Sequence, residues 1–395
     1  MTSGAPTLPS GNALLYRSPT ARSWRTTPIT GVIDFHRTLP GYAPTRLVEL
    51  PAIAAELGVA RVFMKEECER LGLPAFKILG ASYAVVRALA NQLGFAEEVL
   101  SLDGLRTSLA EMANHRPLNP IAPIRLVAAT DGNHGRAVAH MARLLDLPAT
   151  IFYPLGITDD AVAGIRSEGA ETLGLDLPYD DVVAHAERFA TQPGTQSEEG
   201  AERGEVRIHI QDTAWPGYEQ IPQWIVDGYS TLLEECDTDL RGAGVTRLDL
   251  VAVPSGVGSF AQAVVRHYRS TEWAPTLLSV EPTSAPAIIE SLHAGHSLTV
   301  QTGSTIMSGL NCGTPSSLAW PILQSGVDLA IALPDSEAAR AVHDLLDAGV
   351  DVGPCGASTL AGIRALARHE DLPHDAVVLL LSTEAYSANP LPPGM

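Results

Sequence analysis

Short apolar segments alternate with amphipathic segments along most of this chain. Residues 124–129, 149–153 and 248–253 form apolar runs bounded by turn residues, which predicts buried strands. Residues 136–145 and 285–294 place apolar side chains at helical spacing, which predicts helices packed on those strands. Strands and helices that alternate in this way are typical of a parallel sheet covered on both faces. The pattern therefore predicts an α/β fold.

The alternation falls into two series that divide near residues 205–220, so we expect two α/β domains with a cleft between them. The first series contains predicted strands at 124–129, 149–153, 171–175 and 206–211, and predicted helices at 81–93, 136–145, 159–169 and 180–190. The second contains a long helix at 218–236, strands at 248–253, 276–280, 329–333 and 376–381, and helices at 260–268, 285–294, 336–348 and 357–368. A loose arm is expected at 1–30, a mixed stretch punctuated by proline at 94–123, and a polar low-complexity loop at 191–204.

Composition narrows the class of protein. The chain has 395 residues, is 45% hydrophobic, and carries 26 basic against 45 acidic side chains, a formal net charge of -19. No basic run rises above this background, which argues against nucleic acid or an anionic membrane as partner. No apolar run reaches transmembrane length, and the polar N-terminal segment lacks a signal-peptide core. The four cysteines show neither a C-x-x-C pair nor zinc-site spacing. We therefore expect a cytoplasmic protein with free thiols and no metal site.

One lysine stands out within an apolar segment. Lys77 follows the loop-like residues 71–74 and precedes the predicted helix 81–93. Lysine is rarely buried without a partner. An amine in an apolar pocket is easier to deprotonate, and only the neutral amine forms a Schiff base with a carbonyl compound. Taken alone, this segment favours the plainer reading, a lysine that reaches solvent from a helix start.

A glycine-rich turn joins a predicted strand to a predicted helix. Residues 255–259 read Ser-Gly-Val-Gly-Ser, and such a turn lets the backbone and a helix N-terminus approach an anion. The turn lacks the Lys-Ser/Thr signature of a P-loop. Gly256, Gly258 and Ala261 also fit a loose dinucleotide fingerprint, with Glu281 at the end of the next strand, but that reading leaves Lys77 unexplained. An ordinary strand-to-helix turn is the plain alternative.

Two further strand ends carry polar side chains. Residues 131–135 read Asp-Gly-Asn-His-Gly, in which Asp131 is a candidate base and Asn133 a candidate amide donor. Both residues also suit helix capping, and His134 alone is more typical of a structural role. Residues 382–384 read Ser-Thr-Glu, where a hydroxyl can bond a ring nitrogen. In open α/β sheets ligands bind at the carboxyl ends of strands, so these loops and Lys77 predict one shared site. An aldehyde with a phosphate, a ring hydroxyl and a pyridine nitrogen fits them: pyridoxal 5′-phosphate.

The chain resembles the fold-type II pyridoxal-phosphate enzymes, the group of threonine dehydratase, cysteine synthase and the tryptophan synthase β subunit. Within that group it is most similar to the diaminopropionate ammonia-lyases. The resemblance runs from about Pro44 to Glu384 and rests on residues 72–80, 129–136, 211–215 and 304–313. It implies that the cofactor lies in the cleft between the domains and that the protein is a homodimer. We expect residues 1–80 and 218–395 to form the larger, cofactor-binding domain and residues 81–217 a smaller inserted α/β domain.

The resemblance implies roles at matching positions. Lys77 would carry the cofactor and serve as base for the L-substrate, Asp131 would be the base for the D-substrate, and Asp212 would hold or deprotonate the substrate. Asn133 would face the ring hydroxyl, and Ser382 (or Thr383) the pyridine nitrogen. The implied cofactor-binding set is Phe76, Lys77, Asn133, Gly256, Val257, Gly258, Ser259 and Ser382.

The implied reaction is the α,β-elimination of 2,3-diaminopropionate to pyruvate and two ammonia. A related β-elimination or β-replacement on serine, threonine or a cysteine derivative is the alternative, although such an enzyme has no need for the acidic pair Asp131 and Asp212. A protein of this fold that only binds an amino acid is a further alternative, which Lys77 disfavours. The chain departs from the expected motifs at Arg46, Cys68, Pro216 and Ala385. It also departs in the loop 351–357, which lacks the acidic residue of the G-E-S-G-A-like motif usual there.

Overall fold

The computed structural model describes residues 14–94, 101–114, 123–192 and 205–395. Its strands are β1 (Leu14–Arg17), β2 (Leu47–Glu49), β3 (Arg61–Lys65), β4 (Ile124–Ala129), β5 (Ala149–Pro154), β6 (Glu171–Leu175), β7 (Val206–His209), β8 (Leu250–Pro254), β9 (Thr276–Pro282), β10 (Leu329–Leu333) and β11 (Val377–Leu381). Its helices are α1 (Val32–His36), α2 (Pro51–Leu57), α3 (Lys77–Leu93), α4 (Leu102–Asn114), α5 (Asn133–Leu144), α6 (Asp159–Ser167), α7 (Tyr179–Thr191), α8 (Gln220–Gly228), α9 (Ser230–Gly242), α10 (Ser259–Tyr268), α11 (Ala287–Ala294), α12 (Ala319–Gly326), α13 (Asp335–Asp347) and α14 (Pro354–Ala367).

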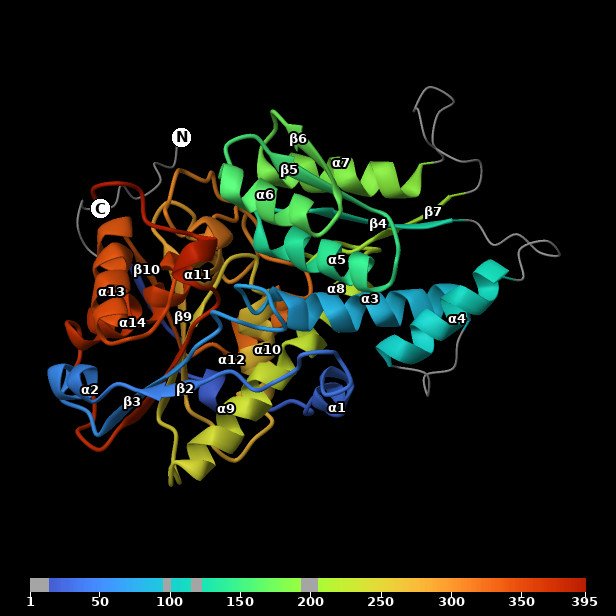
Figure 1. Cartoon of the computed structure of the whole chain (residues 1–395). Coiled ribbons are helices and arrows are strands. Elements are labelled where there is room, and N and C mark those ends of the chain that lie inside the picture. The colour runs from blue at the N-terminus through green and yellow to red at the C-terminus, as the bar shows by residue number, and fades with distance from the viewer. Residues whose placement is uncertain (1–13, 95–100, 115–122, 193–204) are drawn as a thin grey trace.

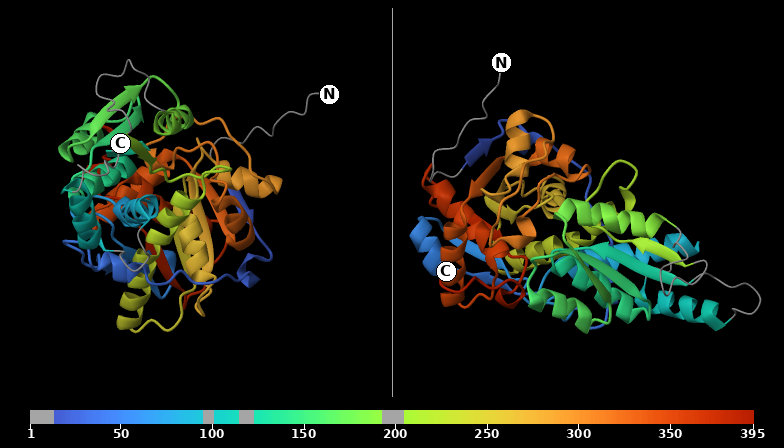
Figure 2. Two further views of the ribbon diagram at one scale, coloured as in Figure 1. Left: turned by 90° about the vertical axis from the view of Figure 1, so that its right-hand side faces the viewer. Right: turned by 90° about the horizontal axis from the view of Figure 1, so that it is seen from above.

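These strands form two separate sheets (Figure 1). The larger sheet has seven strands in the order β1-β10-β9-β8-β11-β3-β2, and the smaller has four in the order β6-β5-β4-β7. All pairings are parallel except those of the edge strands β1 and β2, which run antiparallel to their neighbours. The prediction of two open, mainly parallel sheets is therefore confirmed. Seen from above, the blue, orange and red elements of the larger sheet lie at one end of the molecule and the green elements of the smaller sheet at the other (Figure 2).

Both faces of the smaller sheet are buried, as the continuous apolar runs predict. Leu126 and Ala128 of β4 pack with the apolar face of α5. The alternate residues Val127 and Ala129 pack with α7 on the other face. Successive side chains of a strand point to opposite faces, so one strand needs apolar residues at every position when helices cover both sides.

The larger sheet repeats this arrangement. Val251 of β8 and Leu379 of β11 share a core with α9 and α10, whereas the alternate residues Ala252 and Leu380 share another with α13 and α14. Helices therefore cover both faces of each sheet, and the doubly wound architecture is confirmed. Ligand sites in such folds lie beyond the carboxyl ends of the strands.

Helix α3 carries Lys77 at its first position and is held by an unusually close contact with α8. A Cβ atom added to Gly228 would lie 2.4 Å from the carbonyl oxygen of Leu79 and 2.7 Å from Cα of Gly80. A Cβ added to Gly80 would lie 2.7 Å from Cγ2 of Ile225. The two backbones can approach this closely only because both positions are glycine. The contact fixes the helix start that presents Lys77.

The loop before Lys77 is fixed by a buried ion cluster. Arg70 is fully buried and pairs with Glu67 at 2.5 Å and with Glu235 of α9 at 2.7 Å. Lys65 of β3 pairs with the same Glu235 at 2.9 Å. Each buried charge thus has a partner, which a charge needs when it leaves water. The cluster ties the segment that leads to Lys77 onto α9.

Some local predictions were wrong. The expected loose arm contains β1, which adds to β10 as an antiparallel edge strand, and the ring of Trp24 lies against Gly326. The stretch 94–123 contains α4, and the expected long helix at 218–236 is divided into α8 and α9. The expected loop at 191–204 lies almost entirely outside the described residues. Within the described part of the chain, no helix has the length and apolar character needed to cross a bilayer.

Candidate active site

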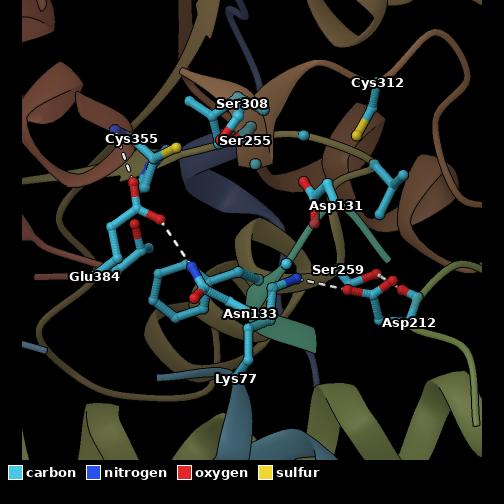
Figure 3. Close-up of a pocket in the computed structure, with 18 of the residues that line it drawn as sticks. Lys77, Asp131, Asn133, Asp212, Ser255, Ser259, Ser308, Cys312, Cys355 and Glu384 are labelled. Atoms are coloured by element: carbon cyan, nitrogen blue, oxygen red, sulfur yellow. Dashed lines mark hydrogen bonds and ion pairs between the residues drawn. The ribbon is translucent and has the colours of Figure 1, made fainter. Parts of the chain in front are cut away.

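A cavity lies between the two sheets and draws its walls from both. Its lining residues come from the start of α3, the loop before α5, the start of α7, the loop before α10, the 308–312 segment and the segment after β11. They include every residue of the predicted site except Ser382: Phe76, Lys77, Asp131, Asn133, Asp212, Gly256, Val257, Gly258 and Ser259. Segments far apart in the sequence therefore meet at the strand ends, as the sequence predicts (Figure 3).

Lys77 points into this cavity and forms an ion pair (Figure 3). Its Nζ donates to Oδ2 of Asp212 at 2.5 Å. Burial by itself lowers the pKa of Lys77, but the Asp212 carboxylate outweighs it, and the pKa is raised above its ordinary value. The sequence-based expectation of an easily deprotonated amine in an apolar pocket is therefore wrong for this state, because the pocket contributes a carboxylate that favours the ammonium form.

Asp212 is held by several contacts besides Lys77. Its backbone oxygen accepts the Ser259 hydroxyl at 2.6 Å, which links it to the glycine-rich turn. Nδ1 of His134 lies 4.0 Å from Oδ2 of Asp212, while its Nε2 bonds the Ile210 carbonyl at 2.8 Å. Burial tends to raise the pKa of Asp212, but Lys77, His134 and hydrogen bonds lower it to about 2. Asp212 is thus an ionised carboxylate beside the lysine.

Asp131 has a different environment from Asp212. Its side chain faces the cavity, with Oδ2 3.8 Å from the position of a Cβ on Gly309, and no side chain of the described residues donates a hydrogen bond to it. Burial raises the pKa of Asp131, and the negative charge of Asp212 raises it further. The positive charge of Lys77 lowers it, but the net shift is upward. A carboxylate with a raised pKa and no side-chain donor is a better proton acceptor than one fixed in an ion pair.

The glycine-rich turn forms a narrow wall. Gly258 has a φ of 96°, a left-handed conformation that favours glycine, and directly precedes α10. A Cβ on Gly256 would lie 2.9 Å from the Gly309 carbonyl oxygen and 3.1 Å from Sγ of Cys312. The N–H groups in the first turn of α10 have no partners within the helix. The turn therefore offers an anion-binding helix N-terminus at a place where no side chain obstructs it.

Asn133 and Glu384 meet on another side of the cavity (Figure 3). Asn133 Nδ2 donates to Oε2 of Glu384 at 3.0 Å, and the backbone N–H of Cys355 donates to Oε1 at 3.3 Å. Asn389 Nδ2 also donates to Oε1 at 3.3 Å. Burial raises the pKa of Glu384 despite these donors. The role of Asn133 toward a ring hydroxyl stays a prediction.

Two hydroxyl groups follow β11. Thr383 lines the cavity, and its Oγ1 is buried without a hydrogen-bond partner among the described residues. Ser382 is fully buried outside the cavity wall, and its Oγ donates to the Glu384 carbonyl at 3.5 Å. An orphaned buried hydroxyl normally indicates a missing partner. Thr383 thus offers a hydroxyl to a ligand, whereas Ser382 has a contact of its own.

These groups fit pyridoxal phosphate. The lysine supplies an amine, the turn at residues 256–259 an anion site, Asn133 an amide donor and Thr383 a free hydroxyl. Phe76 supports the floor, since its ring centroid lies 4.6 Å from that of Tyr229 and 4.5 Å from that of Phe260. No group in this set conflicts with an aromatic ring that carries a phosphate.

The cavity is rich in acids. Asp131, Asp212 and Glu384 line it, and Lys77 is the one cationic side chain among the described lining residues. Sequence reasoning placed Glu384 only at a strand end, and it missed three further wall residues, Tyr179, Cys312 and Cys355. Cys312 lies in the quoted motif 304–313 and Cys355 in the quoted loop 351–357, although neither was assigned to the site. Tyr179 lies in no quoted motif, so no local signal could have identified it.

Comparison with known proteins gives a consistent result. The family model described as "Pyridoxal-phosphate dependent enzyme" matches residues 38–384. The chain is 35% identical over 368 residues to the diaminopropionate ammonia-lyase of Escherichia coli (strain K12), covering 89% of this chain and 86% of that protein. Crystal structures of the Escherichia coli lyase with D-serine and with an aminoacrylate–PLP azomethine reaction intermediate each match with a TM-score of 0.80 at 30% identity, covering 95% of this chain and 94% of the other.

Proposed function

Because this chain belongs to the pyridoxal-phosphate-dependent enzymes, and within them to the diaminopropionate ammonia-lyases, we propose that its cavity residues carry out the α,β-elimination of 2,3-diaminopropionate to pyruvate and two ammonia. The observation that carries this proposal is the pair of aspartates beside Lys77. Asp212 is bonded to the lysine at 2.5 Å, and Asp131 faces the same cavity with no side-chain donor among the described residues.

Bound pyridoxal phosphate supplies an electron sink that acidifies the α-hydrogen of an amino acid attached to it. Lys77 and Asp131 then provide two proton acceptors that reach the cavity from different elements, the start of α3 and the loop before α5. We assign the α-proton of the L-substrate to Lys77 Nζ and that of the D-substrate to the Asp131 carboxylate. Two acceptors on different sides of one carbon allow both enantiomers to react, and a single lysine allows only one. A complex of the Escherichia coli lyase with D-serine supports access of a D-amino acid.

Asp212 stabilises the protonated form of Lys77. Its carboxylate favours the ammonium form of Nζ, and so it holds the proton that the lysine has taken from the substrate. The Ser259 hydroxyl fixes the Asp212 backbone, which couples the position of this carboxylate to the turn assigned to the cofactor phosphate. Thr383, or Ser382, offers a neutral hydroxyl to the pyridine nitrogen.

The charge of the cavity favours diaminopropionate over serine and threonine. Asp131, Asp212 and Glu384 face a single cation, Lys77, among the described lining residues. Diaminopropionate brings an additional amino group that is cationic when protonated, whereas serine and threonine bring a neutral hydroxyl in its place. Carboxylates withdrawn from water need such partners. The acid-rich wall therefore supports a substrate with two amines.

The substrate preference is tested by measuring the 2-oxo acid and the ammonia that are released. Both diaminopropionate enantiomers, serine, threonine and cysteine are supplied separately to the holoenzyme. We expect the highest kcat/KM for diaminopropionate and two ammonia for each pyruvate. A preference for serine, with one ammonia for each pyruvate, or for threonine, with one ammonia for each 2-oxobutyrate, would replace this function with that of a dehydratase.

We also propose how the chain is organised around the site. Residues 1–80 with 218–395 form the larger, cofactor-binding domain, and residues 81–217 form the smaller one, which is supported by the strands of each sheet coming from these ranges. We propose that the protein is a cytoplasmic homodimer. The four cysteines, all free thiols, support a reducing compartment. Light scattering tests the dimer, and the mass of a single chain would contradict it.

A further inference from the structure

Tyr179 is a cavity residue without a role in the reaction described above. It is the first residue of α7 and lines the cavity together with Asp131 and Asp212. Its hydroxyl contacts Gln211, a fully buried residue that directly precedes Asp212. The direction of that hydrogen bond determines what the phenol can do.

The Gln211 side chain has only one consistent orientation. Its Oε1 accepts the backbone N–H of Ala129 at 3.0 Å, and a backbone N–H can only donate. The other end of the amide is therefore the NH₂ group, and Nε2 lies 3.0 Å from the Tyr179 hydroxyl. Nε2 also lies 3.4 Å from Oδ1 of Asp212, as a donor requires. The phenol oxygen of Tyr179 accordingly accepts a hydrogen bond from Gln211.

This leaves the phenol hydrogen of Tyr179 uncommitted. Among the described residues, no acceptor lies within hydrogen-bonding distance of it. Burial, together with the charges of Asp212 and Asp131, raises the pKa of Tyr179 well above its ordinary value, so the hydroxyl stays protonated. Tyr179 is thus a neutral donor with its hydrogen available at the cavity wall.

The cavity needs neutral donors of this kind. An α-amino acid must place its carboxylate near three acidic side chains, and Lys77, the one lining cation in the described part of the chain, is already paired with Asp212. At the start of α5 the N–H of Gly135 donates to Oγ1 of Thr130 at 2.9 Å, whereas the N–H groups of Asn133 and His134 have no partner within the helix and are neutral donors. A phenol can complete such a site without competing for the acids. Ammonium groups on the substrate donate hydrogen bonds, and so its carboxylate is the natural acceptor for the phenol.

We propose that Tyr179 binds the substrate by donating its phenol hydrogen to a carboxylate oxygen of the bound amino acid. Gln211 orients the phenol for this contact. The assignment rests on the proposed function only in that the substrate is an α-amino acid. It does not depend on which β-substituent leaves.

The test compares Tyr179→Phe with Tyr218→Phe in the holoenzyme. Tyr218 provides a matched control, since its hydroxyl accepts the backbone N–H of Gln211 at 2.9 Å and donates to the His209 carbonyl at 2.6 Å, but it does not line the cavity. Both variants lose a phenol hydroxyl bonded to Gln211, and only Tyr179→Phe loses a donor to the cavity. Binding is measured with alanine, which has the carboxylate but nothing to eliminate, by titration of the cofactor absorbance.

In Tyr179→Phe, we expect alanine to bind about tenfold more weakly, which is the usual effect of losing a hydrogen bond to a charged group. KM for diaminopropionate should rise by about the same factor, and kcat should change little. Tyr218→Phe should leave alanine binding close to wild type. Equal effects in the two variants, or unchanged alanine binding in Tyr179→Phe, would overturn the assignment. A wild-type protein that binds alanine but releases no ammonia from diaminopropionate would contradict the proposed function. The comparison of the two variants would still decide the role of Tyr179.

Discussion

The ion pair between Lys77 and Asp212 sets the protonation state of the amine that has to receive the cofactor. Asp212→Asn keeps the size of the side chain but removes its charge. The ammonium then loses the partner 2.5 Å away that raises its pKa, while burial, which lowers the pKa, remains. We expect the pKa of Lys77 in this variant to fall from its raised value back toward its ordinary value of 10.5.

The size of the change follows from the geometry. Two unit charges at about 4 Å interact by about 4 kcal/mol at an effective dielectric constant of about 20, and the shorter contact observed here gives at least that much. Since one pKa unit corresponds to about 1.4 kcal/mol, the pKa should fall by about three units. Near pH 8, the fraction of neutral amine would then rise by up to about a thousandfold.

The assay follows capture of pyridoxal phosphate by the apoenzyme. The rate of appearance of the cofactor band is measured between about pH 6 and pH 10, and borohydride reduction with peptide mapping shows that Lys77 is the residue modified. The pH at which capture becomes fast should be lower in Asp212→Asn than in the wild type by about the same three units. Elimination activity should fall in the same variant, because the lysine has lost the group that holds its proton.

Asp131→Asn serves as the control for capture. Asp131 also carries a charge in the cavity, but it contributes least among the influences on the pKa of Lys77 and makes no hydrogen bond to it. Its capture profile should shift much less than that of Asp212→Asn. If the two variants shifted equally, or if Asp212→Asn required a higher pH than the wild type, the ion pair would not control the lysine.

Three further outcomes follow from the structure. Lys77→Ala should lose both the visible cofactor band and activity, measured by absorbance and pyruvate release; a persistent band would place the cofactor on another group. Asp131→Asn should lose a factor of about 10² to 10⁴ in kcat/KM on D-diaminopropionate, the usual contribution of a general base, and far less on the L-form; equal losses would remove the model with two bases. Burial lowers the pKa of both His36 and His209 to about 3, below their unfolded value of 6.5, so the unfolded chain binds more protons in acid. Stability from these groups is complete above about pH 6.5 and should fall by about 1.4 kcal/mol per pH unit for each histidine toward pH 3, as urea unfolding would show; a flat profile would contradict this.

The sequence predicts the site where a functional residue lies in a motif next to a strand end. Asp131, Asn133 and the turn at residues 256–259 are of this kind, and they line one cavity together with Lys77. Parallel strands bring their carboxyl ends to a common edge, so local order along the chain is enough to bring such residues together. The same reasoning gave both sheets, because fully apolar strands require cover on both faces.

Other features depend on contacts that no local pattern records. The strand β1 forms because a short segment in a polar arm finds the open edge of β10. Tyr179 reaches the cavity only through the packing of α7, and its free hydrogen follows from a buried glutamine on another strand end. The state of Lys77 was mispredicted for the same reason, since its apolar sequence neighbours do not reveal a carboxylate 135 positions away.

The contact of α3 with α8 also bears on motion. Gly228 lies directly against the backbone of Leu79 and Gly80, and Gly80 lies against the side chains of Ile225 and Tyr229. Sliding of one helix past the other is therefore blocked, and rotation about the crossing point is the movement that the contact leaves open. In such a rotation displacement grows with distance from the pivot. Lys77, three residues from Gly80, would then stay nearly still, whereas the loop at Asp131 and the start of α7, which lie farther from the pivot, would move more.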